Sequence, residues 1–258
     1  MFIADIVGPH GFDVIATLLP RLKQEREIDI VIANGENATQ GRGLDDKSIT
    51  RLFNLGIHVI TSGNHIWQRR KYLKQLESNP NILRPLNYPP DTPGHGSCIF
   101  ETDTNVRVGI INLQGRSFMF PIDCPFQRID QEINDMKEQG IHCIVVDFHA
   151  EATAEKIALG YYIDGRVSAV LGTHTHVQTA DEQLLPKGTA YLTDAGMTGP
   201  HRSVIGMNIN TAIQRFITQV PHHYTAASAV DLKLCGAYIA IDPENGIASS
   251  IERIKMDI

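Results

Sequence analysis

The sequence of 258 residues carries a formal net charge of −6, with 42% hydrophobic and 20% charged residues. This length and balance fit one folded α/β domain over residues 1–258, and the net negative charge argues against extended nucleic-acid binding. Because the four cysteines are scattered without a Cys-x-x-Cys pair and no apolar run is long enough to span a bilayer, we expect reduced thiols and a cytoplasmic protein that does not enter the membrane.

Apolar strands alternate with amphipathic helices at the start of the chain. We predict strands at 2–7, 28–33 and 57–61, a helix between Gly8-Pro9 and Glu27, and a second helix from Asp45 to Leu55. This strand–helix–strand order predicts a parallel sheet. Residues 35–43, rich in Gly, Asn and Thr, are predicted to be irregular.

The same kind of pattern continues to the end of the chain. In order, we predict a basic helix at 67–77, an extended Pro-rich stretch at 84–94, a hairpin of 97–100 with 106–112, a helix at 129–139, a strand at 141–147, a helix at 153–159, a strand at 168–171, short strands near Val177 and Ala190, a loop after Met197, a helix at 211–216, and strands at 237–241 and 247–254. Parallel units mixed with hairpin strands predict two sheets packed between helices.

Polar side chains that can bind metal follow the ends of these strands. They comprise two carboxylates, two carboxamides and four imidazoles: Asp5, Glu36, Asn37, Asn64, His65, His149, His174 and His176. Strand ends of an open α/β sheet gather at one edge, so we expect these residues to converge. The set is too large for one tetrahedral zinc and lacks thiolate, but it suffices for two cations that share one carboxylate.

Two simpler interpretations stay open at this point. His174-Thr175-His176 alone fits a pair of loop histidines, and only the whole set favours metal ligands. A mononuclear zinc hydrolase would hold one ion per chain. We assign the other seven histidines to the surface or to packing, Trp67 to packing, and Glu151 and Asp194 to capping or support of the ligands.

The order of the motifs resembles that of the calcineurin-like metallophosphoesterases. Longer matches resemble the YmdB-like bacterial subgroup of that family along nearly the whole chain; they are Asn34-Gly35-Glu36-Asn37-Ala38, Gly63-Asn64-His65, Asn112-Leu113-Gln114-Gly115-Arg116, Asp147-Phe148-His149-Ala150-Glu151 and His174-Thr175-His176-Val177-Gln178. The wider family opens with Asp-x-His, whereas this chain has Asp5-Ile6-Val7. The subgroup shares that change, which supports the narrower assignment.

The resemblance implies a fold, a ligand set and an activity. The fold is a four-layer α/β sandwich of two mixed sheets flanked by helices. Residues that match Glu36 bridge two metal ions; those matching Asp5, Asn37 and His176 complete one site, and those matching Asn64, His149 and His174 complete the other. The residue matching His65 serves as general acid. The usual metals of the family are iron or manganese, with zinc as a further candidate, and the subgroup resemblance suggests a homo-oligomer.

The chemistry of such a set is phosphoester hydrolysis. Two cations lower the pKa of a bound water and neutralise phosphoryl oxygens, while a histidine protonates the leaving alkoxide. We therefore expect a dinuclear phosphodiesterase for small phosphodiesters, with 2',3'-cyclic or 3',5'-cyclic nucleotides as substrates by resemblance. The alternative is a nucleotide-binding regulatory or scaffold protein with weak hydrolase activity. His65 favours the enzyme, because a pure binder needs no proton donor.

Overall fold

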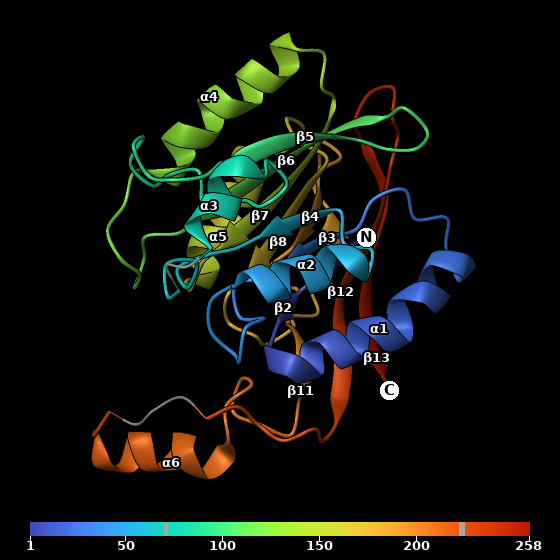
Figure 1. Ribbon diagram of the computed structural model, residues 1–258. Coiled ribbons are helices and arrows are strands. Elements are labelled where there is room, and N and C mark those ends of the chain that lie inside the picture. Colours follow the sequence, from blue (N-terminus) through green and yellow to red (C-terminus); the bar gives the residue numbers. More distant parts are fainter. Residues whose placement is uncertain (70–71, 222–224) are drawn as a thin grey trace.

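The computed structural model describes residues 1–69, 72–221 and 225–258, and its strands form two sheets (Figure 1). Within these residues the first sheet has seven strands: β1 (Phe2–Ile3), β2 (Asp5–Ile6), β3 (Ile32–Asn34), β4 (Val59–Thr61), β11 (Met197–Pro200), β12 (Leu232–Ile241) and β13 (Ala248–Asp257). Their order is β2-β11-β12-β1-β3-β4, and β13 pairs with β12. β1, β3 and β4 are parallel, as the strand–helix–strand pattern predicts.

The second sheet contains six strands of the described chain: β5 (Ser97–Glu101), β6 (Arg107–Gln114), β7 (Cys143–His149), β8 (Ala169–Thr173), β9 (Gln183–Leu184) and β10 (Ala190–Leu192). The order is β5-β6-β7-β8-β10-β9. β6, β7, β8 and β10 are parallel, whereas β5 runs antiparallel to β6, which confirms the predicted hairpin.

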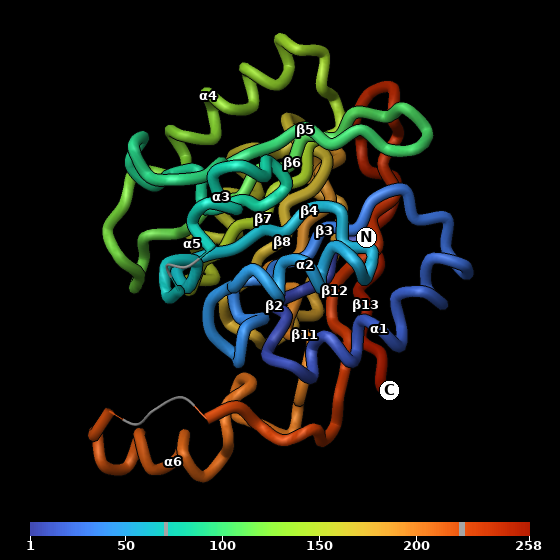
Figure 2. The backbone as a smooth tube through the Cα atoms, in the orientation of Figure 1, coloured from blue at the N-terminus to red at the C-terminus, as the bar shows by residue number. Residues whose placement is uncertain are grey.

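Six helices complete the described residues: α1 (Gly8–Glu25), α2 (Asp46–Asn54), α3 (Leu73–Ser78), α4 (Pro125–Glu138), α5 (Thr153–Tyr162) and α6 (Ile209–Thr218). The side chain of Asp45 caps α2 by accepting the backbone N–H of Ser48. Figure 2 shows α6 standing away from the rest of the molecule. None of these helices is long and apolar enough to cross a bilayer.

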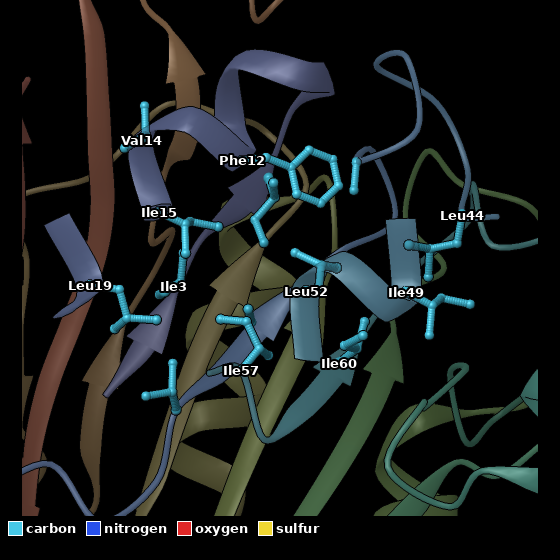
Figure 3. Close-up of a cluster of buried hydrophobic side chains, with 14 of the residues drawn as sticks. Ile3, Phe12, Val14, Ile15, Leu19, Leu44, Ile49, Leu52, Ile57 and Ile60 are labelled. Atoms are coloured by element: carbon cyan, nitrogen blue, oxygen red, sulfur yellow. The ribbon is translucent and has the colours of Figure 1, made fainter. Parts of the chain in front are cut away.

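Three buried clusters show that the sheets and helices form four layers. One cluster joins α1, α2 and α3 to the first sheet, and Figure 3 shows part of it, including Ile15 of α1, Leu52 of α2 and Ile60 of β4. A second cluster lies between the two sheets, and a third joins α4 and α5 to the second sheet. Alternation along the strands decides which cluster each residue enters, as for Phe2 between the sheets and Ile3 under the helices. The predicted α/β sandwich is therefore confirmed.

Three local predictions were wrong. Residues 67–69 are not helical, because a turn begins at Asn64 and regular helix starts only at Leu73; residues 70 and 71 lie outside the described part. No strand forms near Val177, where the chain is irregular. Conversely, residues 197–200 form β11 beside β2, although their Gly and Pro are typical of a loop.

Candidate metal centre at the strand ends

The eight predicted site residues lie together at the carboxyl ends of strands from both sheets. Asp5 lies in β2, Glu36 and Asn37 follow β3, and Asn64 and His65 follow β4. The second sheet contributes His149 at the end of β7, with His174 and His176 after β8. The site therefore spans the junction of the two sheets, and Asp5, Glu36, Asn37 and His149 are almost completely buried in it.

One half of the site is built around His149. Its Nε2 lies 3.0 Å from Asn64 Oδ1, 3.2 Å from Glu36 Oε1 and 3.0 Å from His174 Nδ1. One ligand atom each of Glu36, His149 and His174 falls within 4.8 Å of the other two. Four potential ligand atoms, from the ends of four different strands or the turns after them, thus converge on one small volume.

Contacts outside this group favour the tautomer of each neutral ring in which the outer nitrogen carries the hydrogen. Thr173 Oγ1 donates to Asp147 at 2.7 Å, so it accepts from His149 Nδ1 at 2.9 Å. His174 Nε2 lies 3.0 Å from the Glu151 carboxylate, which favours the hydrogen of the neutral ring on that nitrogen. In the neutral rings, His149 Nε2 and His174 Nδ1 face each other as two lone pairs, which a proton or a metal cation between them would stabilise.

The pKa values of the two imidazoles show that this half of the site favours positive charge. Burial opposes protonation of His149, but the carboxylates of Glu36 and Asp5 raise its pKa to about 9. Burial and the neighbouring charge of His149 lower the pKa of His174 to about 3. A proton on His149 therefore substitutes for a cation, and metal binding would displace it.

The other half of the site lies on the opposite side of Glu36. Asp5 Oδ1, Glu36 Oε1 and His176 Nε2 all approach the same end of the Asn37 amide, at 3.4, 3.3 and 3.2 Å. His176 donates its Nδ1–H to the Ile205 carbonyl at 3.0 Å, which leaves Nε2 free to bind. Burial would raise the pKa of Asp5, but the charge of His176 holds it below its ordinary value. His174 and His176 thus face different groups of ligands.

His65 lies beside Glu36 and Asn37 rather than inside either group. Its backbone N–H donates to Glu36 Oε2 at 2.8 Å, and its Nδ1 is 2.7 Å from Asn37 Oδ1. The side chain is 19% exposed, and no polar atom of the described chain contacts Nε2. The ring is therefore fixed at one nitrogen and free at the other.

The backbone near the site includes a glycine that permits close approach and two residues with positive φ. A Cβ on Gly63 would lie 2.0 Å from His149 Cδ2, so only glycine lets the β4 loop approach that ring. His174 and His176 have φ of 102° and 64°, in the left-handed region that non-glycine residues seldom adopt. Alternating left-handed residues turn both imidazoles inward, and such strain is concentrated at functional sites.

A buried layer behind the ligands could not be identified from the sequence. Asp147 accepts hydrogen bonds from Thr61 at 2.5 Å, Asn34 at 3.1 Å and Thr173, and burial raises its pKa to about 7. In the sequence, Asp147 appears only as the first residue of the motif that contains His149, and nothing there indicates its contacts. These contacts couple the first sheet to the ligand strand of the second.

The expected supporting residues take their predicted places. Asp194 forms a buried ion pair with Lys156 at 2.7 Å and accepts the backbone N–H of Thr175 between the two histidines. Trp67 packs beside the first cluster and against Tyr88. None of the remaining described histidines joins the ligand groups, and His222 and His223 lie outside the described residues.

Comparisons with known proteins agree with the fold and with the family that the sequence resembles. A family model described as "YmdB-like protein" matches residues 1–254. A Bacillus subtilis protein named "2',3'-cyclic-nucleotide 2'-phosphodiesterase" is 45% identical over 257 residues, which cover 100% of this chain and 96% of that protein.

Two solved structures resemble the whole chain. A hypothetical protein from Thermus thermophilus has a TM-score of 0.92 and 40% identity, over 99% of this chain and 98% of the other. A novel phosphatase from Mycoplasma pneumoniae also has a TM-score of 0.92, with 35% identity over 99% of this chain and 92% of the other.

Proposed function

The chain belongs to the YmdB-like protein family, and on that premise we propose that it is a dinuclear metal-dependent phosphodiesterase that hydrolyses cyclic nucleotides. The observation that carries this proposal is the pair of ligand groups on either side of Glu36. The similarity of the chain to a 2',3'-cyclic-nucleotide 2'-phosphodiesterase favours 2',3'-cyclic esters as the substrates. Iron or manganese fits the mixed nitrogen and oxygen ligands, and neither half offers a thiolate.

The donor atoms of both halves support two ions. Asn64, His149 and His174 would hold one ion, Asp5, Asn37 and His176 the other, and Glu36 both. In the second half, a 180° rotation of the Asn37 amide exchanges its oxygen Oδ1 and its nitrogen Nδ2, which have similar shape. It would place Oδ1 among the three acceptors of Asp5, Glu36 and His176, where it becomes a fourth ligand.

The same rotation favours one tautomer of His65. Asn37 Nδ2 would then donate to His65 Nδ1, which at present lies 2.7 Å from the other end of the amide. The ring proton is left on Nε2, the nitrogen that no described polar atom contacts. When bound, the metal ions supply a water of lowered pKa and neutralise the phosphoryl oxygens. His65 Nε2 donates its proton to the leaving oxygen, a step typically worth about 10²–10⁴-fold in rate.

Metal counting and a substrate panel test this proposal. The purified protein, loaded with iron, manganese or zinc, should bind two ions per chain by elemental analysis. It should hydrolyse 2',3'-cyclic nucleotides faster than 3',5'-cyclic nucleotides. One ion per chain would favour a mononuclear hydrolase instead, and hydrolysis of no cyclic nucleotide with any metal would contradict the proposed activity.

Replacement of His65 separates an enzyme from a nucleotide-binding scaffold. His65→Ala should lower kcat by about 10²–10⁴-fold and leave the metal content at the wild-type level, because the ring lies outside both ligand groups. His142→Ala, which removes an exposed histidine, is the matched control. Unchanged hydrolysis by His65→Ala would refute its assignment as general acid.

We also propose that the protein is a homo-oligomer that uses α6. Ile213, Phe216 and Ile217 on this helix are 45%, 71% and 70% exposed, and α6 stands apart from the sandwich (Figure 1). An apolar surface of this kind is typical of a protein interface. Ile213→Asp with Ile217→Asp should reduce the mass measured by analytical ultracentrifugation, and an unchanged mass would exclude this helix as the interface.

A further inference from the structure

The loop of residues 115–121 carries the two most exposed large apolar side chains of the described chain. Phe118 is 92% exposed and Phe120 is 81% exposed, and Met119 and Pro121 lie beside them. Single exposed apolar residues are common on protein surfaces, but neighbouring aromatic residues form a patch, which is typical of a binding surface. Neither the fold nor the two ligand groups explain this pair.

A cavity connects these aromatic residues to the metal centre. Its volume is about 400 Å³, and it is lined by Phe118, Met119, Phe120 and Pro121 of this loop together with Asn64 and His174. Small-molecule sites commonly have volumes of about 300–1,000 Å³. The lining therefore combines two proposed metal ligands with apolar side chains, among them two aromatic rings.

The 115–121 loop is held at both of its ends. Gly115 donates its backbone N–H to the His149 carbonyl at 3.0 Å, and Arg116 and Ser117 donate theirs to the Glu155 carboxylate at 3.0 and 3.1 Å. A Cβ on Gly115 would lie 2.7 Å from Glu155 Oε2, so glycine permits this approach.

Beyond the loop, Asp123 donates its backbone N–H to the Asn87 carbonyl at 3.1 Å. At the tip, Phe118 has a φ of 61°, a conformation that a non-glycine residue adopts only under local constraint. Fixed ends and a constrained tip hold the aromatic rings outward instead of letting them fold onto the surface.

We propose that Phe118 and Phe120 form a stacking platform for the nucleobase of a cyclic mononucleotide whose phosphodiester lies at the metal centre. This inference rests on the proposed function and identifies the part of the site that would recognise the base. A molecule with an anionic group at one end and a flat aromatic ring at the other matches this combination of metal ligands and aromatic side chains in the lining. Stacking accepts every base, because each has a π-face, so the platform selects nucleotides over base-free phosphodiesters.

Binding and kinetics of matched ligands test the platform. Metal-loaded wild type, Phe118→Ala, Phe120→Ala and the double variant are titrated calorimetrically with adenosine 3'-monophosphate and with inorganic phosphate. Loss of base stacking should weaken nucleotide binding by about 5- to 150-fold and change the affinity for phosphate by less than about twofold. Tyr161→Ala, which removes another exposed aromatic side chain, should leave both affinities unchanged, and Phe118→Tyr should retain nucleotide binding.

The kinetic arm uses 2',3'-cyclic AMP and the base-free glycerol 1,2-cyclic phosphate. The double variant should lose kcat/KM for the nucleotide and keep it for the glycerol ester. Equal affinity of wild type and double variant for the nucleotide would overturn the platform. An altered sedimentation coefficient with unchanged nucleotide affinity would overturn it too, by assigning the two rings to a subunit contact. If wild type hydrolyses neither ester, the proposed function fails, and the calorimetric comparison still decides whether the rings bind a base.

Discussion

Thr173 gives the sharpest test of how the buried layer supports the metal centre. Its hydroxyl accepts from His149 Nδ1 at 2.9 Å and donates to Asp147 at 2.7 Å, and it is completely buried. Thr173→Val would leave the His149 N–H unpaired, at a cost of roughly 1–3 kcal/mol. Loss of a partner behind a metal ligand typically weakens metal binding by about 10–100-fold, or roughly 1.4–2.7 kcal/mol. We expect the affinity of the protein for one of the two ions to fall by this factor.

The chain offers a matched control for this substitution. Thr61 is also completely buried and donates to the same carboxylate of Asp147 at 2.5 Å, but it does not contact His149. Thr61→Val should therefore cost similar stability in a denaturant titration and leave both metal affinities nearly unchanged. Thr173→Ser, which keeps the hydroxyl, should retain metal binding. Competition titrations with manganese measure the affinities, and equal weakening by Thr61→Val and Thr173→Val would refute a specific link through Thr173.

Three other substitutions or treatments test further parts of the structure. Burial and the Lys23 charge lower the pKa of His58, whose Nδ1 accepts the Val31 N–H at 3.0 Å. The unfolded chain therefore binds the extra proton, and this contribution to stability is present above about pH 6.5 and lost as the pH falls below it. His58→Asn should flatten the decline in unfolding free energy between pH 7 and pH 5, and an unchanged slope would contradict this assignment. Burial raises the pKa of Cys98 to about 12, whereas Cys124 is only half-buried. Iodoacetamide should alkylate Cys124 in the folded protein and all four cysteines in urea, as mass spectrometry can show; labelling of Cys98 at the rate of Cys124 would argue against the buried position. Gly63→Ala should destabilise the protein by about 1–3 kcal/mol and reduce the number of bound ions, because its Cβ would lie 2.0 Å from His149 Cδ2; a full metal content would show that the ring can move aside.

The ligand-bearing strand ends were predictable because their signals are local. An apolar run followed by Gly, Asn or His indicates both a buried strand and a polar turn after it, as at β4 and β8. Parallel order then brings these turns to one edge without any knowledge of side-chain contacts. The positions of Asn64 and His174 follow from this reasoning alone.

The buried layer and the aromatic loop could not be predicted in the same way. Asp147 interacts with Thr61 and Asn34, which are 86 and 113 residues away in the chain, and nothing in the local pattern links them. Phe118 and Phe120 resemble core residues in composition, and only their exposure distinguishes them. Residues 67–69 continue a helical pattern, but a turn that brings Asn64 and His65 toward Glu36 prevents that helix from starting there.

Packing between the sheets determines the geometry of the proposed metal centre. Glu36 belongs to the first sheet and His149 to the second, yet their ligand atoms lie 3.2 Å apart. Each follows, by four residues, an apolar side chain of the cluster between the sheets: Ile32 precedes Glu36 and Val145 precedes His149. The separation of the ligands is therefore fixed by the same contacts that dock the sheets. Since the ligand groups form only when both sheets are docked, metal binding should stabilise the whole sandwich rather than a single loop.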